Sequence, residues 1–96
     1  MKARKTSELK RILQLKGFEL NPAKKHHQYY YLVVKGKKTA VKTYLSHSGP
    51  EYGDTLMQLV KKQLKFQETR KAEDFFDCPM SAEQYVVMLK ELGHLK

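Results

Sequence analysis

Apolar residues recur at two different intervals along this chain, and each interval is typical of one kind of element. In the first segment they fall at helical spacing, and a glycine follows where a left-handed residue commonly ends a helix. The residues concerned are Leu9, Ile12, Leu13 and Gly17. They predict a helix from about residue 7 to residue 16. The next residues, Phe18 to Leu20, alternate as a short strand does, and Asn21-Pro22 ends this strand with a strong turn signal.

The middle of the chain predicts a β-hairpin. Strand-forming residues are dense from His26 to Val34, and Lys35-Gly36-Lys37 then supplies a turn. The following strand, Thr39 to Leu45, alternates between two faces, because successive side chains of a strand point to opposite sides. One set is Thr39, Val41, Thr43 and Leu45, and the other is Ala40, Lys42 and Tyr44. We expect one of the two faces to be buried.

Two helices are expected after the hairpin. Asp54 can cap the first, whose apolar residues at helical spacing are Leu56, Leu59, Val60 and Leu64. Ser81 and Gln84 have the spacing of a capping box for the second, whose buried residues are expected to be Tyr85, Met88, Leu89 and Leu92. Residues 67–74 between them are predicted as a polar connection. The order predicts an α+β fold, α-β-β-β-α, with a three-stranded antiparallel sheet and an appended C-terminal helix.

Positive charge is concentrated in the first two thirds of the chain. The sequence has 19 Lys and Arg against 10 Asp and Glu, a net charge of +9 over 96 residues. Residues 1–65 alone carry 15 basic and 4 acidic side chains, whereas the remainder carries 4 basic and 6 acidic ones. A basic body attracts nucleic acid or an anionic membrane surface. We therefore expect a basic domain, residues 1–66, and an acidic helical extension, residues 67–96, packed on it.

The acidic extension has two interpretations. In the first, its carboxylates compete with RNA phosphates for the lysines of the basic domain; these carboxylates are Glu68, Glu73, Asp74 and Asp77. In the second, the extension is a structural part of the core. The residues that would then be buried are Phe75, Phe76, Tyr85, Met88 and Leu89.

Cysteine content and hydropathy indicate a cytoplasmic protein. Cys78 is the only cysteine, so the chain can form no internal disulfide and a monomer has no cysteine-based zinc site. The basic residues 1–5 are not followed by the apolar run of a signal peptide, and no segment approaches transmembrane length. We expect no membrane partner.

Histidine beside lysine is the candidate chemistry of this sequence. Lys24-Lys25-His26-His27 opens the first hairpin strand, and imidazole is the side chain most easily poised to move protons near neutral pH. RNA carries its own nucleophile in the 2′-hydroxyl, so a histidine that acts as general acid or base can cut it with no metal and no cofactor. We assign this role to His26. His47, in the loop before the next helix, is a candidate second proton-transfer group, and a turn residue in the alternative interpretation.

Strand alternation decides which residues accompany His26. His26, Gln28 and Tyr30 share one face of the strand, and His27 shares the other with Tyr29 and Tyr31. If Tyr29, Tyr31 and Val33 pack beneath the helices, His26 and Gln28 lie outward. The RNA contacts that we then expect are Lys24, Lys25, Gln28, Lys35, Lys37, Lys38 and Lys42.

Three short motifs stand out between residues 7 and 64: Lys16-Gly17-Phe18, His26-His27-Gln28-Tyr29, and His47-Ser48-Gly49 leading into Gly53-Asp54-Thr55-Leu56. Together they resemble the motifs of the HicA ribonuclease toxins. The resemblance implies a fold like that of the double-stranded-RNA-binding domain (dsRBD-like). It also implies cutting of messenger RNA, with His26 as the catalytic histidine, under control of a HicB-type antitoxin.

Other functions remain open on the residues. A non-catalytic nucleic-acid-binding module of the same fold is the main alternative, because Lys24-Lys25 replaces the small residues that precede the histidine in that family. An interaction protein that assembles through its acidic tail is a third. The tyrosines of the hairpin can stack on unpaired bases or belong to the core. An exposed Tyr30 beside Leu32 and Val34 would leave an apolar sheet face, which a homodimer would cover.

Overall fold

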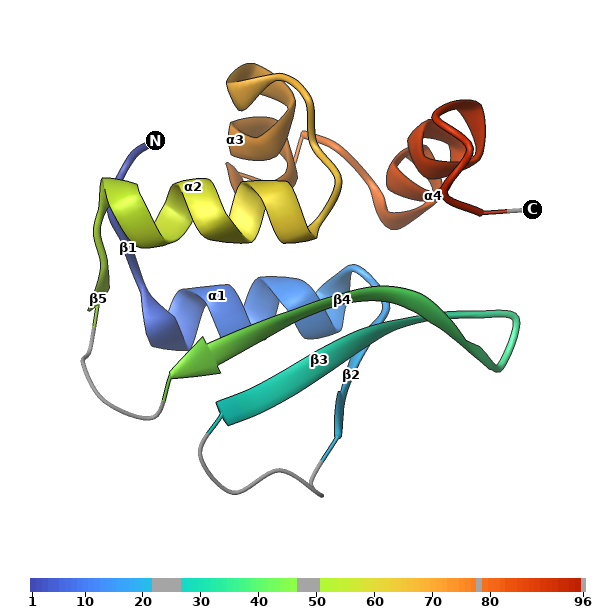
Figure 1. Cartoon of the computed structure of the whole chain (residues 1–96), viewed down its shortest axis with the longest axis horizontal. Helices are drawn as coiled ribbons and strands as arrows, with labels where there is room; N and C mark the ends of the chain where they lie inside the picture. Colours follow the sequence, from blue (N-terminus) through green and yellow to red (C-terminus); the bar gives the residue numbers. More distant parts are fainter. Residues whose placement is uncertain (22–26, 47–50, 78, 96) are drawn as a thin grey trace.

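The computed structural model describes residues 1–21, 27–46, 51–77 and 79–95. It confirms the α+β fold and the α-β-β-β-α order (Figure 1). The first helix and the sheet strands are α1 (Thr6–Leu15), β2 (Phe18–Asn21), β3 (His27–Val34) and β4 (Lys37–Ser46). The later helices are α2 (Asp54–Gln63), α3 (Thr69–Asp77) and α4 (Ala82–Glu91). Two short strands, β1 (Arg4–Lys5) and β5 (Glu51–Tyr52), pair with each other beside the main sheet.

The main sheet is antiparallel, in the order β2-β3-β4. Its β3–β4 hairpin turns at Lys35 and Gly36, whose φ angles of 52° and 77° are both positive. Two positive φ angles in a two-residue turn follow the right-handed twist of the flanking strands. In Figure 1 this turn lies on the same side of the molecule as α4.

The sheet buries the face opposite to the one expected. Tyr30 and Leu32 of β3 are 2% and 1% exposed, whereas Tyr29, Tyr31 and Val33 are only half-buried. The prediction that Tyr29, Tyr31 and Val33 pack beneath the helices is therefore wrong. The reason lies in the hairpin register, which places Lys42 opposite Tyr31 and Lys38 opposite Val33. Burying that face would bury two ammonium groups, whereas Tyr30 lies opposite Thr43.

Helices α1 and α2 cover the buried face. α1 contributes Leu9, Ile12 and Leu13, as its spacing predicts. α2 contributes Met57 and Val60, while Leu56 and Leu59 of the predicted set are 42% and 41% exposed. α2 is also fixed to β4 by a polar contact, because the buried Thr43 hydroxyl donates to Gln63 Oε1 at 2.6 Å.

The acidic extension belongs to the same core. Residues 69–77, which fall largely in the predicted polar connection, form α3. Phe75 of α3 is fully buried, with its ring centroid 4.9 Å from that of Tyr85 in α4 and 6.4 Å from that of Phe18 in β2. The Tyr85 hydroxyl donates to the carbonyl of Leu64 at 2.8 Å, and burial raises its pKa, so it stays a neutral donor. The acidic extension is thus a structural part of the core. The division of the chain into two domains at residue 66 stays a prediction.

The carboxylates of α3 are partly occupied by an arginine. Arg4 in β1 is 5% exposed and donates to Asp77 at 2.9 Å and to Glu73 at 3.1 Å, with its guanidinium 5.3 Å from the ring centroid of Phe76. The hydrogen bond from Arg4 holds the pKa of the Asp77 carboxyl below its ordinary value. Two of the four carboxylates expected to compete with RNA therefore have a partner within the fold.

We expect Phe75→Ala to lower the free energy of unfolding by about 3–5 kcal/mol, because it empties a site that the sheet, α3 and α4 share. Val87→Ala is the matched control, since Val87 on α4 is 53% exposed and its truncation should change stability by about 0.5 kcal/mol or less. Urea unfolding of both variants checks this. Equal urea midpoints for Phe75→Ala and Val87→Ala would mean that the acidic extension is not part of the core.

Candidate nucleic-acid interface

The sheet face turned away from the core carries aromatic and basic side chains on β3 and β4, and the β2 register places the acidic Glu19 beside Tyr31 on the same face. Strand alternation on β3 brings out Tyr29 and Tyr31, and the register places Tyr44 opposite Tyr29 and Lys42 opposite Tyr31. We call the set of Tyr29, Tyr31, Tyr44, Lys38 and Lys42 the tyrosine–lysine face. The three tyrosines are half-buried and the two lysines are exposed.

The three tyrosine rings form a continuous row. The rings of Tyr29 and Tyr31 have centroids 6.4 Å apart and planes only 25° apart, as neighbours two residues apart on one strand can have. Across the hairpin, the Tyr44 centroid lies 5.4 Å from that of Tyr29, with the planes at 39°. A row of rings on a sheet offers π faces on which unpaired bases can stack.

Two ammonium groups lie over this row. Lys38 Nζ is 4.4 Å from the centroid of Tyr31, and Lys42 Nζ is 5.7 Å from that of Tyr31 and 6.0 Å from that of Tyr29. An exposed cation–π contact stabilises by only about 0.5–1 kcal/mol. A phosphate can therefore draw these ammonium groups away from the rings at little cost, and the rings then accept bases.

The tyrosine–lysine face continues into a hollow at the edge of β4. The hollow has a volume of about 290 Å³, and its wall includes Tyr29, Lys42 and Tyr44 from the face. Gln63 at the end of α2 and Lys65 just after it also line the hollow. Lys65 had no predicted role, because nothing in the sequence relates the end of α2 to the open face.

The structure places the predicted RNA contacts in different settings. Lys35 and Lys37 are exposed at the hairpin turn, and Lys38 and Lys42 are exposed on the tyrosine–lysine face. Gln28 lies opposite Leu45, which is fully buried, and its own Oε1 is buried with no hydrogen-bond partner among the described residues. The prediction that Gln28 points outward, on which its RNA contact depended, is therefore wrong.

The other predicted site residues, Lys24, Lys25, His26 and His47, lie outside the described residues. The described residues next to the two histidines in sequence are His27 and Ser46, and these are register partners at one end of the hairpin.

The apolar sheet face on which a homodimer was predicted is absent from the described sheet. Tyr30 and Leu32, two of the three residues expected to form it, are buried under the helices. Within the part of the chain that the structure describes, no group of three or more His, Cys, Asp or Glu side chains could hold a metal ion. The described helices also include none long and apolar enough to cross a membrane.

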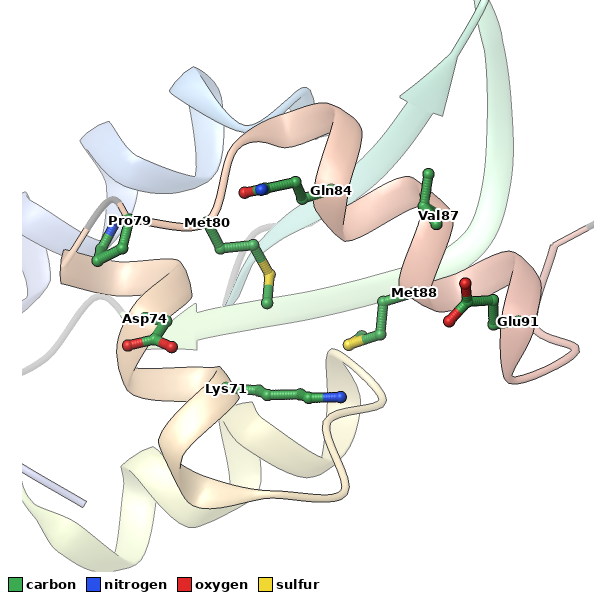
Figure 2. A pocket seen from close by; sticks show the side chains of 8 residues that line it. All are labelled: Lys71, Asp74, Pro79, Met80, Gln84, Val87, Met88 and Glu91. Atoms are coloured by element: carbon green, nitrogen blue, oxygen red, sulfur yellow. The ribbon is translucent and has the colours of Figure 1, made fainter.

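A hollow of about 370 Å³ between α3 and α4 is less suited to a polyanion. Figure 2 shows Met80 and Met88 extending into it, with Lys71 and Asp74 on the α3 side and Glu91 on α4. Two carboxylates against one ammonium group give this hollow the wrong charge balance for phosphates. The tyrosine–lysine face is therefore the stronger candidate.

Comparison of the chain with protein-family models, with curated proteins and with solved structures found no match. The resemblance to HicA toxins stays a prediction that depends on the short motifs alone.

Tyrosine truncation distinguishes the two faces of β3. We expect Tyr30→Ala to lower the free energy of unfolding by about 3–5 kcal/mol, and Tyr31→Ala by about 1–2 kcal/mol, because only the first leaves a cavity in the core. Both variants delete the same atoms from neighbouring positions, so each is the control for the other. Thermal or urea unfolding measures the difference, and a larger loss for Tyr31→Ala would reverse the face assignment.

Proposed function

We propose that this chain is an RNA-binding protein whose tyrosine–lysine face stacks unpaired bases and neutralises their phosphates. One observation carries the proposal: three tyrosine rings form a row on an open sheet face, and two exposed ammonium groups lie over it. Aromatic sheet surfaces of this kind recognise single-stranded RNA in other modules, whereas duplex bases are stacked on each other and closed to such contact.

The charge of the chain supports the same partner. Lysines near a bound strand release counterions from its phosphates, which raises affinity without reading sequence. Stacking also depends little on the base sequence, since every base has a π face. The proposed binding is therefore sequence-tolerant, specific for unpaired strands and strongly dependent on salt.

Tyr31→Leu tests the stacking directly. Leucine keeps an apolar side chain on the face but removes the ring, and we expect it to weaken binding of an unstructured oligouridine by about 1–3 kcal/mol. Tyr31→Phe keeps the ring and should bind as the unmodified protein does. Fluorescence anisotropy with labelled RNA measures both, and equal affinity for Tyr31→Leu and Tyr31→Phe would contradict the role of the ring.

RNA cleavage is a second candidate function, in the manner of a HicA-type mRNA interferase. It is favoured by the pairing of His27 with Ser46, because His26 and His47 adjoin these two residues in sequence. A pair of histidines can serve as acid and base around a 2′-hydroxyl and a leaving oxygen, without a metal. On this proposal the protein acts in the cytoplasm and a HicB-type antitoxin is its regulatory partner. Without cleavage, the protein is a binding module of the same fold.

His26→Ala separates the two functions. We expect it to slow cleavage of an oligoribonucleotide by about two to four orders of magnitude, because it removes the proton-transfer group, while affinity for a deoxy-substituted oligonucleotide stays unchanged. The cleavage rate of the unmodified protein should not change when a chelator is added. Equal rates for His26→Ala and the unmodified protein would rule out His26 as the catalytic group.

A further inference from the structure

A second basic hollow lies at the C-terminal end of α2. Its volume is about 400 Å³, and three of the residues that line it are lysines: Lys61, Lys62 and Lys65. Gln58 and Gln67 add two side-chain amides, His94 adds an imidazole, and none of the described residues in the wall is acidic. Phosphate oxygens are strong acceptors for ammonium and amide donors, so the lining has the chemistry of a phosphate site.

Lys65 joins this hollow to the tyrosine–lysine face. It lines both this hollow and the one beside Tyr29, Lys42 and Tyr44 at the edge of β4. The two hollows therefore adjoin at one cation. A strand that has its bases on the tyrosines can pass Lys65 and continue along α2.

The backbone of Lys65 gives independent support. Lys65 has a φ of 71° and follows the end of α2, where its N–H donates to the carbonyl of Lys62 and the N–H of Phe66 donates to that of Lys61, both at 3.1 Å. α4 ends in the same hydrogen-bond pattern, but there the left-handed position is Gly93. Glycine is the usual residue at this position, because a side chain strains a left-handed backbone.

A lysine at a position that favours glycine destabilises the end of α2. A cation near a helix C-terminus is favourable, but Lys61 and Lys62 already supply two in the last turn. Within the described residues Lys65 forms no ion pair that would explain the strain. Unlike glycine, the lysine supplies a cation to both hollows.

We infer that one RNA strand occupies both hollows: its bases stack on the tyrosine–lysine face and its continuing backbone phosphates bind Lys61, Lys62 and Lys65. This inference rests on the proposed RNA binding and extends it. It predicts a binding site longer than the tyrosine row, with a second part that reads only phosphate.

Strand length is the first test. An oligouridine of about ten nucleotides should bind more tightly than one of about three, which covers the tyrosines alone. The double variant Lys61→Gln with Lys62→Gln should lose this gain, and its slope of log affinity against log salt should fall by about 0.7 for each lost contact, on the long oligonucleotide only. Lys90→Gln is the matched control, because Lys90 also lies in the last turn of a helix but lines neither hollow.

Lys65→Gly is the second test, since a structural and a functional role predict opposite results. Relief of the strained backbone should raise the thermal midpoint by about 4 °C, while loss of the cation should weaken binding of the long oligonucleotide. Lys65→Arg keeps the cation and should restore binding without raising the midpoint. A lowered midpoint for Lys65→Gly would overturn the strain argument and the inference with it.

The outcomes separate this inference from the proposed function. If the lysine variants bind the long oligonucleotide normally while Tyr31→Leu weakens it, the second hollow is not part of the site and the tyrosine–lysine face remains. If neither set of variants changes binding, both proposals fail.

Discussion

Lys42 and Lys38 lie directly across the hairpin from Tyr31 and Val33, and this pairing determines which face of the sheet can be buried. Turning that face inward would bury two ammonium groups, and burying a charge is costly unless it is paired and hydrogen-bonded. The opposite face, with Tyr30 and Leu32, takes the helices instead. The same constraint leaves Tyr29, Tyr31 and Tyr44 on the outer face of the sheet, next to the lysines, and so forms the tyrosine–lysine face.

The C-terminal helices complete the core without covering that surface. Phe75 and Tyr85 close the aromatic cluster behind the sheet, and Lys16 at the end of α1 is held over the Phe75 ring, 5.7 Å from its centroid, and donates to the carbonyl of Met80. Arg4 draws the carboxylates of Glu73 and Asp77 towards the β1 side of the molecule. Two of the acidic residues in the tail are thus used in the fold, and the lysines of the tyrosine–lysine face stay exposed.

Much of the fold could be predicted from the sequence, because helical spacing, glycine stops and the Ser81 capping box are local signals. Each element that was predicted formed close to its expected bounds, whereas α3 and the short strands β1 and β5 were not predicted. The buried face of β3 could not be predicted from alternation, since tyrosines stand on both of its faces; only the pairing with β4 decides between them. α3 was missed although its buried residues, Ala72, Phe75 and Phe76, stand at helical spacing, because they come at the end of an otherwise polar stretch. Lys65 was missed because its proximity to the sheet is a tertiary feature.

The most direct test of RNA binding on the tyrosine–lysine face is an NMR titration of the intact chain with an unstructured oligouridine. The titration follows the resonances of the aromatic rings and of the lysine side chains next to their ammonium groups. Ring stacking shifts the resonances of the groups that it touches, so we expect the largest changes at Tyr29, Tyr31 and Tyr44, with Lys42 among the affected lysines. Changes confined to the hollow between α3 and α4, with the three tyrosines unaffected, would contradict RNA binding on this face.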